Sequence, residues 1–177
     1  MIEMDKRKLS SKIRVVSNHK KAVSCPEKRL RFYTKYANVV SETLRKPLFQ
    51  RFLNWMIRRE NIEKMSVKDI QVRVFPFQKE NGKALAGRCN RKGVILLFPK
   101  IWRFLQKKAR NHGNDDVCFY IKSRARAALI HEILHLKYED NEHEVRRLTR
   151  KYFDMFTHHL NIPTRTMTML QMSLFKF

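Results

Sequence analysis

Residues 127–136 read A-A-L-I-H-E-I-L-H-L, which places an H-E-x-x-H pattern inside an apolar run of helix-forming residues. On a helix, positions i and i+4 lie one above the other on the same face, so His131 and His135 can both turn an imidazole nitrogen toward one point. Tetrahedral Zn²⁺ accepts ligands arranged in this way. Glu132 lies one step around the helix, where it can reach water beside the metal without ligating the metal. The pattern therefore predicts a zinc site with Glu132 as general base.

The apolar residues around this pattern leave little of the helix polar, so the segment is expected to run through the core. Two histidines and a glutamate buried there need partners, because an unpaired buried charge costs free energy, and a metal would supply them. A shuffled chain of this composition would contain the pattern in roughly 1–2% of cases. The alternative interpretation is two core histidines hydrogen-bonded to the backbone beside a surface glutamate.

The third zinc ligand is sought just after the motif, because a catalytic zinc generally takes three protein ligands and leaves one position for water. If the chain turns at residues 140–141, the first turn of the next helix returns beside the metal. His143 is the predicted ligand, since imidazole is the commoner zinc partner. Glu142 and Glu144 remain alternatives, because a carboxylate is equally good chemistry in this position.

The overall charge is the second strong feature of the chain. Lys and Arg number 39 against 16 Asp and Glu, which gives a net charge of +23. Such a surface attracts polyanions, and release of counterions from nucleic acid is the usual driving force. Nucleic acid, with DNA favoured, is therefore an expected partner. The alternatives are an acidic protein, an anionic lipid surface, or a basic surface with no dedicated partner.

The N-terminal 26 residues are predicted to form a flexible basic arm, followed by one domain over residues 27–177. A short strand at residues 13–16 is the alternative for part of that arm. Nothing in the sequence is long and apolar enough to span a membrane, and no secretory signal is seen at the N-terminus. The 3 cysteines contain no C-x-x-C pair, which indicates free thiols in a reducing cytoplasm.

Hydrophobic periodicity predicts an α+β domain, in which a small sheet of three to four strands, mostly antiparallel, packs on helices that include the H-E-x-x-H helix. The strands are expected from alternating or continuous apolar residues near a hairpin signal at Asn81-Gly82. The tail over residues 166–175 could add a strand or pack as an arm. The expected strands are 70–77, 84–89 and 94–98. The expected helices are one that Pro26 opens, with a buried face over residues 30–44 and a break or kink at Pro47, one through residues 49–57, a basic one from 102, the motif helix from about 119 to 138, and one from about 142 to 160.

Residues 131–138 read H-E-I-L-H-L-K-Y and follow an expected strand and then an expected helix. This motif and this order of elements resemble the zincin metallopeptidases. Within them the chain is most similar to the small intracellular SprT-like, Spartan and YgjP-like group. The resemblance covers residues 94–153 in the order of elements, and only the motif helix residue by residue. It implies that His131 and His135 are zinc ligands and Glu132 the general base. It also implies that extended substrate adds as a strand beside Val94–Phe98.

The Spartan group acts on proteins crosslinked to DNA, a role that the basic surface of this chain would suit. The sequence departs from the YgjP-like pattern at two positions after the motif. Asn141 stands where that pattern has a third His, and Arg147 stands where it often has a Phe. A glutamate-zincin arrangement with Glu142 or Glu144 therefore remains open.

The sequence thus predicts a zinc metallopeptidase that hydrolyses peptide bonds in proteins and is associated with or stimulated by DNA. Its expected location is the cytoplasm, at the nucleoid or chromatin. The rival hypothesis is a basic nucleic-acid-binding protein whose zinc site is structural or absent and which has no peptidase activity.

Overall fold

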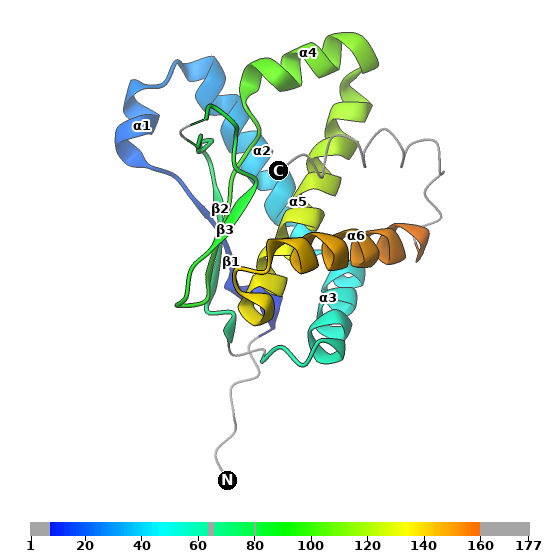
Figure 1. Cartoon of the computed structure of the whole chain (residues 1–177). Coiled ribbons are helices and arrows are strands. Elements are labelled where there is room, and N and C mark those ends of the chain that lie inside the picture. The colour runs from blue at the N-terminus through cyan, green and yellow to red at the C-terminus, as the bar shows by residue number, and fades with distance from the viewer. Residues whose placement is uncertain (1–7, 64–65, 80, 160–177) are drawn as a thin grey trace.

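The α+β architecture is seen in a computed structural model that describes residues 8–63, 66–79 and 81–159 (Figure 1). A four-stranded sheet lies on one side of a long central helix, and helices both earlier and later in the chain pack against that helix. The tail over residues 166–175 lies outside the described residues. The elements in chain order are η1 (Leu9–Lys12), β1 (Ile13–Val16), α1 (His19–Ser24), α2 (Glu27–Arg45), α3 (Pro47–Arg59), β2 (Asp69–Arg73), β3 (Gly87–Cys89), β4 (Val94–Leu97), α4 (Trp102–His112), α5 (Asn114–Tyr138) and α6 (Glu142–His159).

The sheet has the strand order β1-β2-β4-β3. β2 pairs in parallel with β1 and with β4, and only β3 and β4 are antiparallel. The expectation of a mostly antiparallel sheet is therefore wrong. The chain leaves β2, turns through a hairpin and forms β3 at the sheet edge, so that β4 returns between β3 and β2. β4 has a strand on each side in the sheet, and its burial alternates along the strand: Ile95 and Leu97 are buried, whereas Val94 and Leu96 are half-buried.

Part of the expected N-terminal arm belongs to the fold. β1 pairs with β2 over residues 13–16, and Leu9 and Ile13 are buried in the core. Arg14 also forms an ion pair with Asp69 of β2. The prediction of a flexible arm over residues 1–26 is corrected accordingly: its strand alternative is what the structure shows, because these apolar side chains complete the edge of the core. Residues 1–7 lie outside the described part of the chain.

Helix α5 is the centre of the molecule. Its side chains from Tyr120 to Leu134 are almost all buried, since the sheet, α2, α4 and α6 all contact it. The helix starts at Asn114, earlier than predicted. Gly113, with a φ of +86°, is the single residue that connects α4 to α5, so no longer loop is needed. A positive φ is a conformation that glycine adopts at little cost. The apolar stretch around the H-E-x-x-H pattern is thus core, as the sequence indicated.

None of the three cysteines forms a disulfide, and all are half-buried free thiols. Among the described ranges, no helix has both the length and the apolar character needed to cross a membrane.

Candidate metal centre

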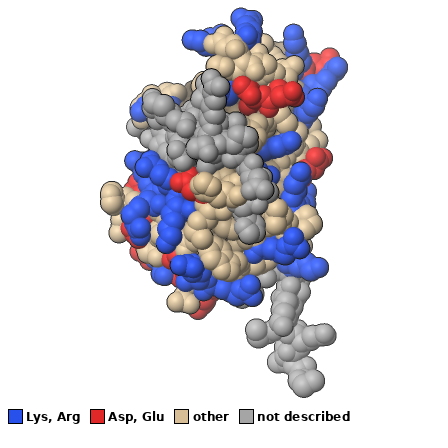
Figure 2. All heavy atoms as spheres, turned by 90° about the vertical axis from the view of Figure 1, so that its right-hand side faces the viewer, with Lys and Arg blue, Asp and Glu red and all other residues tan. Residues whose placement is uncertain are grey.

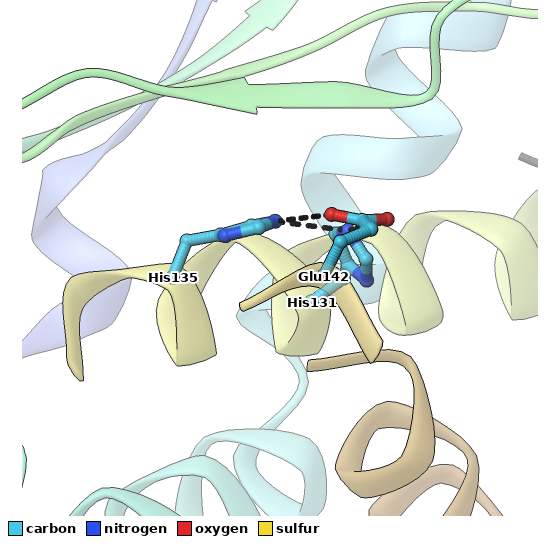
Figure 3. Close-up of side chains that lie close together, drawn as sticks. All are labelled: His131, His135 and Glu142. Atoms are coloured by element: carbon cyan, nitrogen blue, oxygen red, sulfur yellow. Dashed lines mark hydrogen bonds and ion pairs between the residues drawn. The ribbon is translucent and has the colours of Figure 1, made fainter. Parts of the chain in front are cut away.

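Three side chains from two helices converge on one point (Figure 3). α5 contributes His131 and His135, which lie one turn apart, and the first residue of α6 contributes Glu142. The Nε2 atoms of the two histidines are 3.1 Å apart. The carboxylate oxygens of Glu142 lie 3.3 Å from Nε2 of His135 and 3.6 Å from Nε2 of His131.

These separations fit a tetrahedral zinc ion. With bonds of about 2.0–2.2 Å, two ligand atoms of such an ion lie roughly 3.3–3.6 Å apart. The three measured separations, 3.1, 3.3 and 3.6 Å, fall at or close to that range. Two imidazoles and a carboxylate are also a donor set that zinc accepts, and they leave a fourth position open.

Hydrogen bonds on the far side of each ring fix which nitrogen carries the proton. Nδ1 of His135 lies at the backbone carbonyl of Glu139, which can only accept, so Nδ1 carries hydrogen. Nδ1 of His131 lies 3.2 Å from the hydroxyl of Thr149, which already donates its own hydrogen to the carbonyl of Val145. Nδ1 of His131 must therefore donate as well. Whenever either ring is neutral, its unprotonated nitrogen is therefore Nε2, which is the atom that faces the other histidine.

Two imidazole lone pairs and a carboxylate thus point at one another. Burial lowers the pKa of His131 to about 4, against the opposing effect of Glu142, so that this ring is neutral near pH 7. Neutral imidazole is the form that ligates a metal. A cation at the point of convergence could be coordinated by all three groups. One carboxylate oxygen of Glu142 also accepts a hydrogen bond from Nε of Arg146 at 2.7 Å, which helps to hold this carboxylate in position.

The structure does not bring His143 to this group. His143 is exposed, and Glu144 is held by Arg147 in an ion pair on the surface of α6. The side chain of Asn141 accepts a hydrogen bond from the backbone N–H of Glu144 and caps the helix, so that residue 142 is the first in α6. Consecutive helical residues point in directions about 100° apart, so only one of residues 142 and 143 can face the histidines. Of the alternatives left open by the sequence, Glu142 is the one placed there.

Glu132 lies in the same cleft as the three convergent side chains. The cleft has a volume of about 1070 Å³ and is lined on its other side by β3. Glu132 is 5% exposed, and burial raises its pKa to about 8, although a hydrogen bond from the backbone of Cys89 acts in the opposite direction. Gly87 of β3 packs directly on this side chain: a Cβ at Gly87 would lie 2.7 Å from Cγ of Glu132. A glycine inside a strand pattern is a signal of such close approach.

The outer edge of β3 faces the cleft. The backbone of Ala86 and of Asn90 bonds to β4, through Phe98 and Val94 respectively. Along an antiparallel pair, residues whose backbone groups bond to the neighbouring strand alternate with residues whose backbone groups point outward. Gly87 lies next to Ala86 in this alternation, so its N–H and C=O groups point away from β4. The expectation that substrate adds beside Val94–Phe98 is therefore wrong. β4 is paired on both sides, and β3 is the edge strand next to the candidate metal centre.

Arg124 ties this edge of the sheet to α5. Its guanidinium is buried and donates to the carbonyl oxygens of Phe98 at 2.6 Å and of Leu85 at 3.2 Å. Phe98 directly follows β4, and Leu85 lies just before β3. Arg124 therefore holds the end of the sheet that contains the edge strand at a fixed distance from α5. Nothing in the sequence distinguishes Arg124 from the neighbouring cations Lys122 and Arg126, so its role could not be predicted.

A buried carboxylate holds the turn between α5 and α6. Glu60, at the end of α3, accepts hydrogen bonds from the hydroxyl of Tyr138 at 2.6 Å and from the hydroxyl of Tyr152. Nζ of Lys137 lies 3.5 Å from the same carboxylate. Burial raises the pKa of Glu60, but these donors outweigh burial and leave it below the ordinary value. The network joins the last turn of α5 to α6 and so supports the position of Glu142.

Comparison of the chain with protein-family models, curated proteins and solved structures finds no match.

Proposed function

We propose that this protein is a zinc-dependent peptidase with a zincin-like fold, in which His131, His135 and Glu142 are the zinc ligands and Glu132 is the general base. The observation that carries the proposal is the convergence of two unprotonated Nε2 atoms and a carboxylate at separations of 3.1–3.6 Å. A bound cation would explain this arrangement, because it would be coordinated by all three groups. The residue order H-E-x-x-H on α5 puts a buried carboxylate next to it.

The residues around the centre suit peptide hydrolysis. A bound zinc ion supplies a Lewis acid that polarises a carbonyl and makes water more acidic. Burial alone favours the neutral carboxyl of Glu132, and a bound cation would favour its ionised form. In that form Glu132 is the group that would take a proton from the attacking water and deliver it to the leaving amine. The cleft beside Glu132 is large enough for an extended peptide, and the outward N–H and C=O groups of Gly87 can hydrogen-bond to its backbone. The substrate would then add as a strand at the outer edge of β3.

The experiment is the variant Glu132→Gln, assayed after loading with one equivalent of zinc. We expect cleavage of an unfolded protein and of a fluorogenic peptide pool to fall by about 10³-fold or more, with zinc content unchanged, because the base is lost and the ligands remain. Glu27→Gln, which changes an exposed ion pair on α2, is the matched control and should cleave normally. Unchanged cleavage by Glu132→Gln, or no cleavage by zinc-loaded wild type even with DNA present, would overturn the proposal.

Association with nucleic acid is the second part of the proposed function. Figure 2 shows Lys and Arg spread over one face of the molecule, with much less Asp and Glu exposed there. Arg51 and Arg58 of α3 lie seven positions apart, thus on one side of the helix, and line a hollow of about 630 Å³ together with Asn54. Neighbouring guanidinium groups in a hollow are suited to phosphate, which they bind in a bidentate manner.

Titration of labelled DNA at several salt concentrations tests this part. Because each neutralised phosphate contributes about 0.9 to the slope of log K against log salt for duplex DNA, Arg51→Gln with Arg58→Gln should flatten that slope by about 2. An unchanged slope would show that Arg51 and Arg58 of α3 do not contact DNA phosphates. DNA binding with bound zinc but without any peptidase activity would favour the rival function, a nucleic-acid-binding protein with a structural zinc.

A further inference from the structure

A second hollow opens beside the candidate metal centre. It has a volume of about 340 Å³ and shares Lys79, Leu85, Ala86 and Arg146 with the main cleft, so the two are continuous. Its remaining charged lining residues are Lys83 and Lys100. Four cationic side chains thus surround one small space at the end of the edge strand.

Two of these cations face each other across a hairpin. The backbone N–H of Lys79 donates to the carbonyl of Lys83 at 2.9 Å, and the N–H of Gly82 returns to the carbonyl of Lys79 at 2.9 Å. Gly82 has a φ of +73°, which closes the hairpin tightly. Like charges directly opposite one another are destabilising in such a ladder. Both lysine side chains are exposed, so solvent screens their repulsion, and an anion bound between them would be attracted by both.

Lys100 adds a partly desolvated charge. It is half-buried, and its Nζ lies 5.0 Å from the ring centroid of Phe104, which also lines the hollow. Burial lowers the pKa of Lys100, and the nearby Arg124 lowers it further. Among the carboxylates that the structure describes, none forms an ion pair with Lys79, Lys83 or Lys100. Glu80 lies outside the described residues.

We propose that this hollow binds an acidic side chain of the peptide substrate, so that the enzyme prefers Asp or Glu close to the cleaved bond. The inference rests on the proposed peptidase function. A peptide added along β3 passes Glu132 at Gly87 and reaches residues 84–86 within one to three residues, since a strand rises about 3.3 Å per residue. The hollow lies at those residues. A side chain of a substrate bound in this way enters a space lined by Lys79, Lys83 and Lys100.

The test uses zinc-loaded full-length protein and paired fluorogenic peptides. The members of each pair differ only in Asp or Glu against Asn or Gln, at one of three positions on either side of the cleaved bond. At one position or more we expect kcat/KM to favour the acid by about tenfold, the size of one well-placed charge-assisted contact. In the double variant Lys83→Gln/Lys100→Gln, kcat/KM for the acidic peptide should fall to the value for its amide partner. Lys107→Gln, on the exposed side of α4, is the control and should keep the preference.

The possible outcomes separate the two proposals. Cleavage with no acidic preference, or with a preference that survives both substitutions, overturns the role of the hollow and leaves the peptidase proposal standing. Absence of cleavage of any peptide overturns both. If the two substitutions weaken binding of a labelled oligonucleotide tenfold and leave the peptide preference intact, the hollow binds phosphate groups of nucleic acid and the assignment to substrate is wrong.

Discussion

Substitution of Gly87 by alanine tests how closely the edge strand is fitted to Glu132, the proposed general base. Gly87 has no unusual backbone conformation that excludes other residues, so the new methyl group acts through contact alone. It would lie 2.7 Å from Cγ and from Oε1 of Glu132, whereas ordinary contacts begin near 3.4 Å. The Glu132 side chain must therefore retreat by about 0.7 Å, or the strand must move by as much.

A shift of this size has a calculable effect on catalysis. Misplacement of a reacting group by about 1 Å can cost roughly 10²-fold in rate. We expect kcat/KM for peptide cleavage to fall by about 10- to 100-fold, and the free energy of unfolding to fall by about 1–3 kcal/mol through overpacking. Zinc affinity should be unaffected, because none of the three proposed ligands touches Gly87.

The assay compares zinc-loaded wild type, Gly87→Ala, and Gly87→Ala combined with Glu132→Gln. If the methyl group acts by displacing the carboxylate, it should cost nothing further once Glu132 is glutamine. Gly113→Ala is the control: it strains a positive φ of +86° with open space around it, and so lowers stability without slowing cleavage. Full activity in Gly87→Ala, or an equal loss in both backgrounds, would refute the fit between β3 and Glu132.

Three further predictions concern stability. Zinc at about 1,000 times its Kd should stabilise the fold by about 4 kcal/mol and raise Tm by roughly 8–16 °C, and a chelator should reverse this in a thermal melt; no shift would mean that zinc does not bind the folded state. Glu60→Gln should lower the free energy of unfolding at pH 7 by about 1–3 kcal/mol. Because the pKa of Glu60 is lowered by folding, its contribution is present above the ordinary value of 4.5 and is lost as the pH falls further, so denaturant curves of variant and wild type should converge in acid; a gap that persists there would contradict the ionised network. Arg124→Met should cost about 2–4 kcal/mol in the same measurement, since it leaves the carbonyls of Leu85 and Phe98 without a donor; a loss under 1 kcal/mol would show that water replaces it.

The central helix could be predicted from the sequence, and the order of the strands could not. The apolar surroundings of His131 and His135 are a local signal, and local periodicity fixes which face of a helix carries both rings. The run at Val94–Leu97 shows equally well that a strand is buried, but not which strands lie beside it. Pairing with β2 on one side and β3 on the other depends on contacts between distant segments, to which a local pattern is insensitive.

The third residue of the candidate metal centre could not be identified from the sequence for a related reason. Glu142, His143 and Glu144 are adjacent, and a shift of one residue in the start of α6 changes which side chain faces the histidines. That start is set by the cap at Asn141 and by the distant Glu60, which joins α5 to α6 through Tyr138 and Tyr152. Chemistry alone favoured imidazole, and the turn geometry placed a carboxylate.

The proposed metal centre is tested most directly by zinc affinity, measured by competition with a chromophoric chelator, in wild type and in two variants at neighbouring positions. We expect one zinc per chain, a Kd weakened by about 10²-fold or more in Glu142→Gln, and a Kd within about twofold of wild type in His143→Gln. Zinc that is lost in His143→Gln and retained in Glu142→Gln would contradict the proposed metal centre.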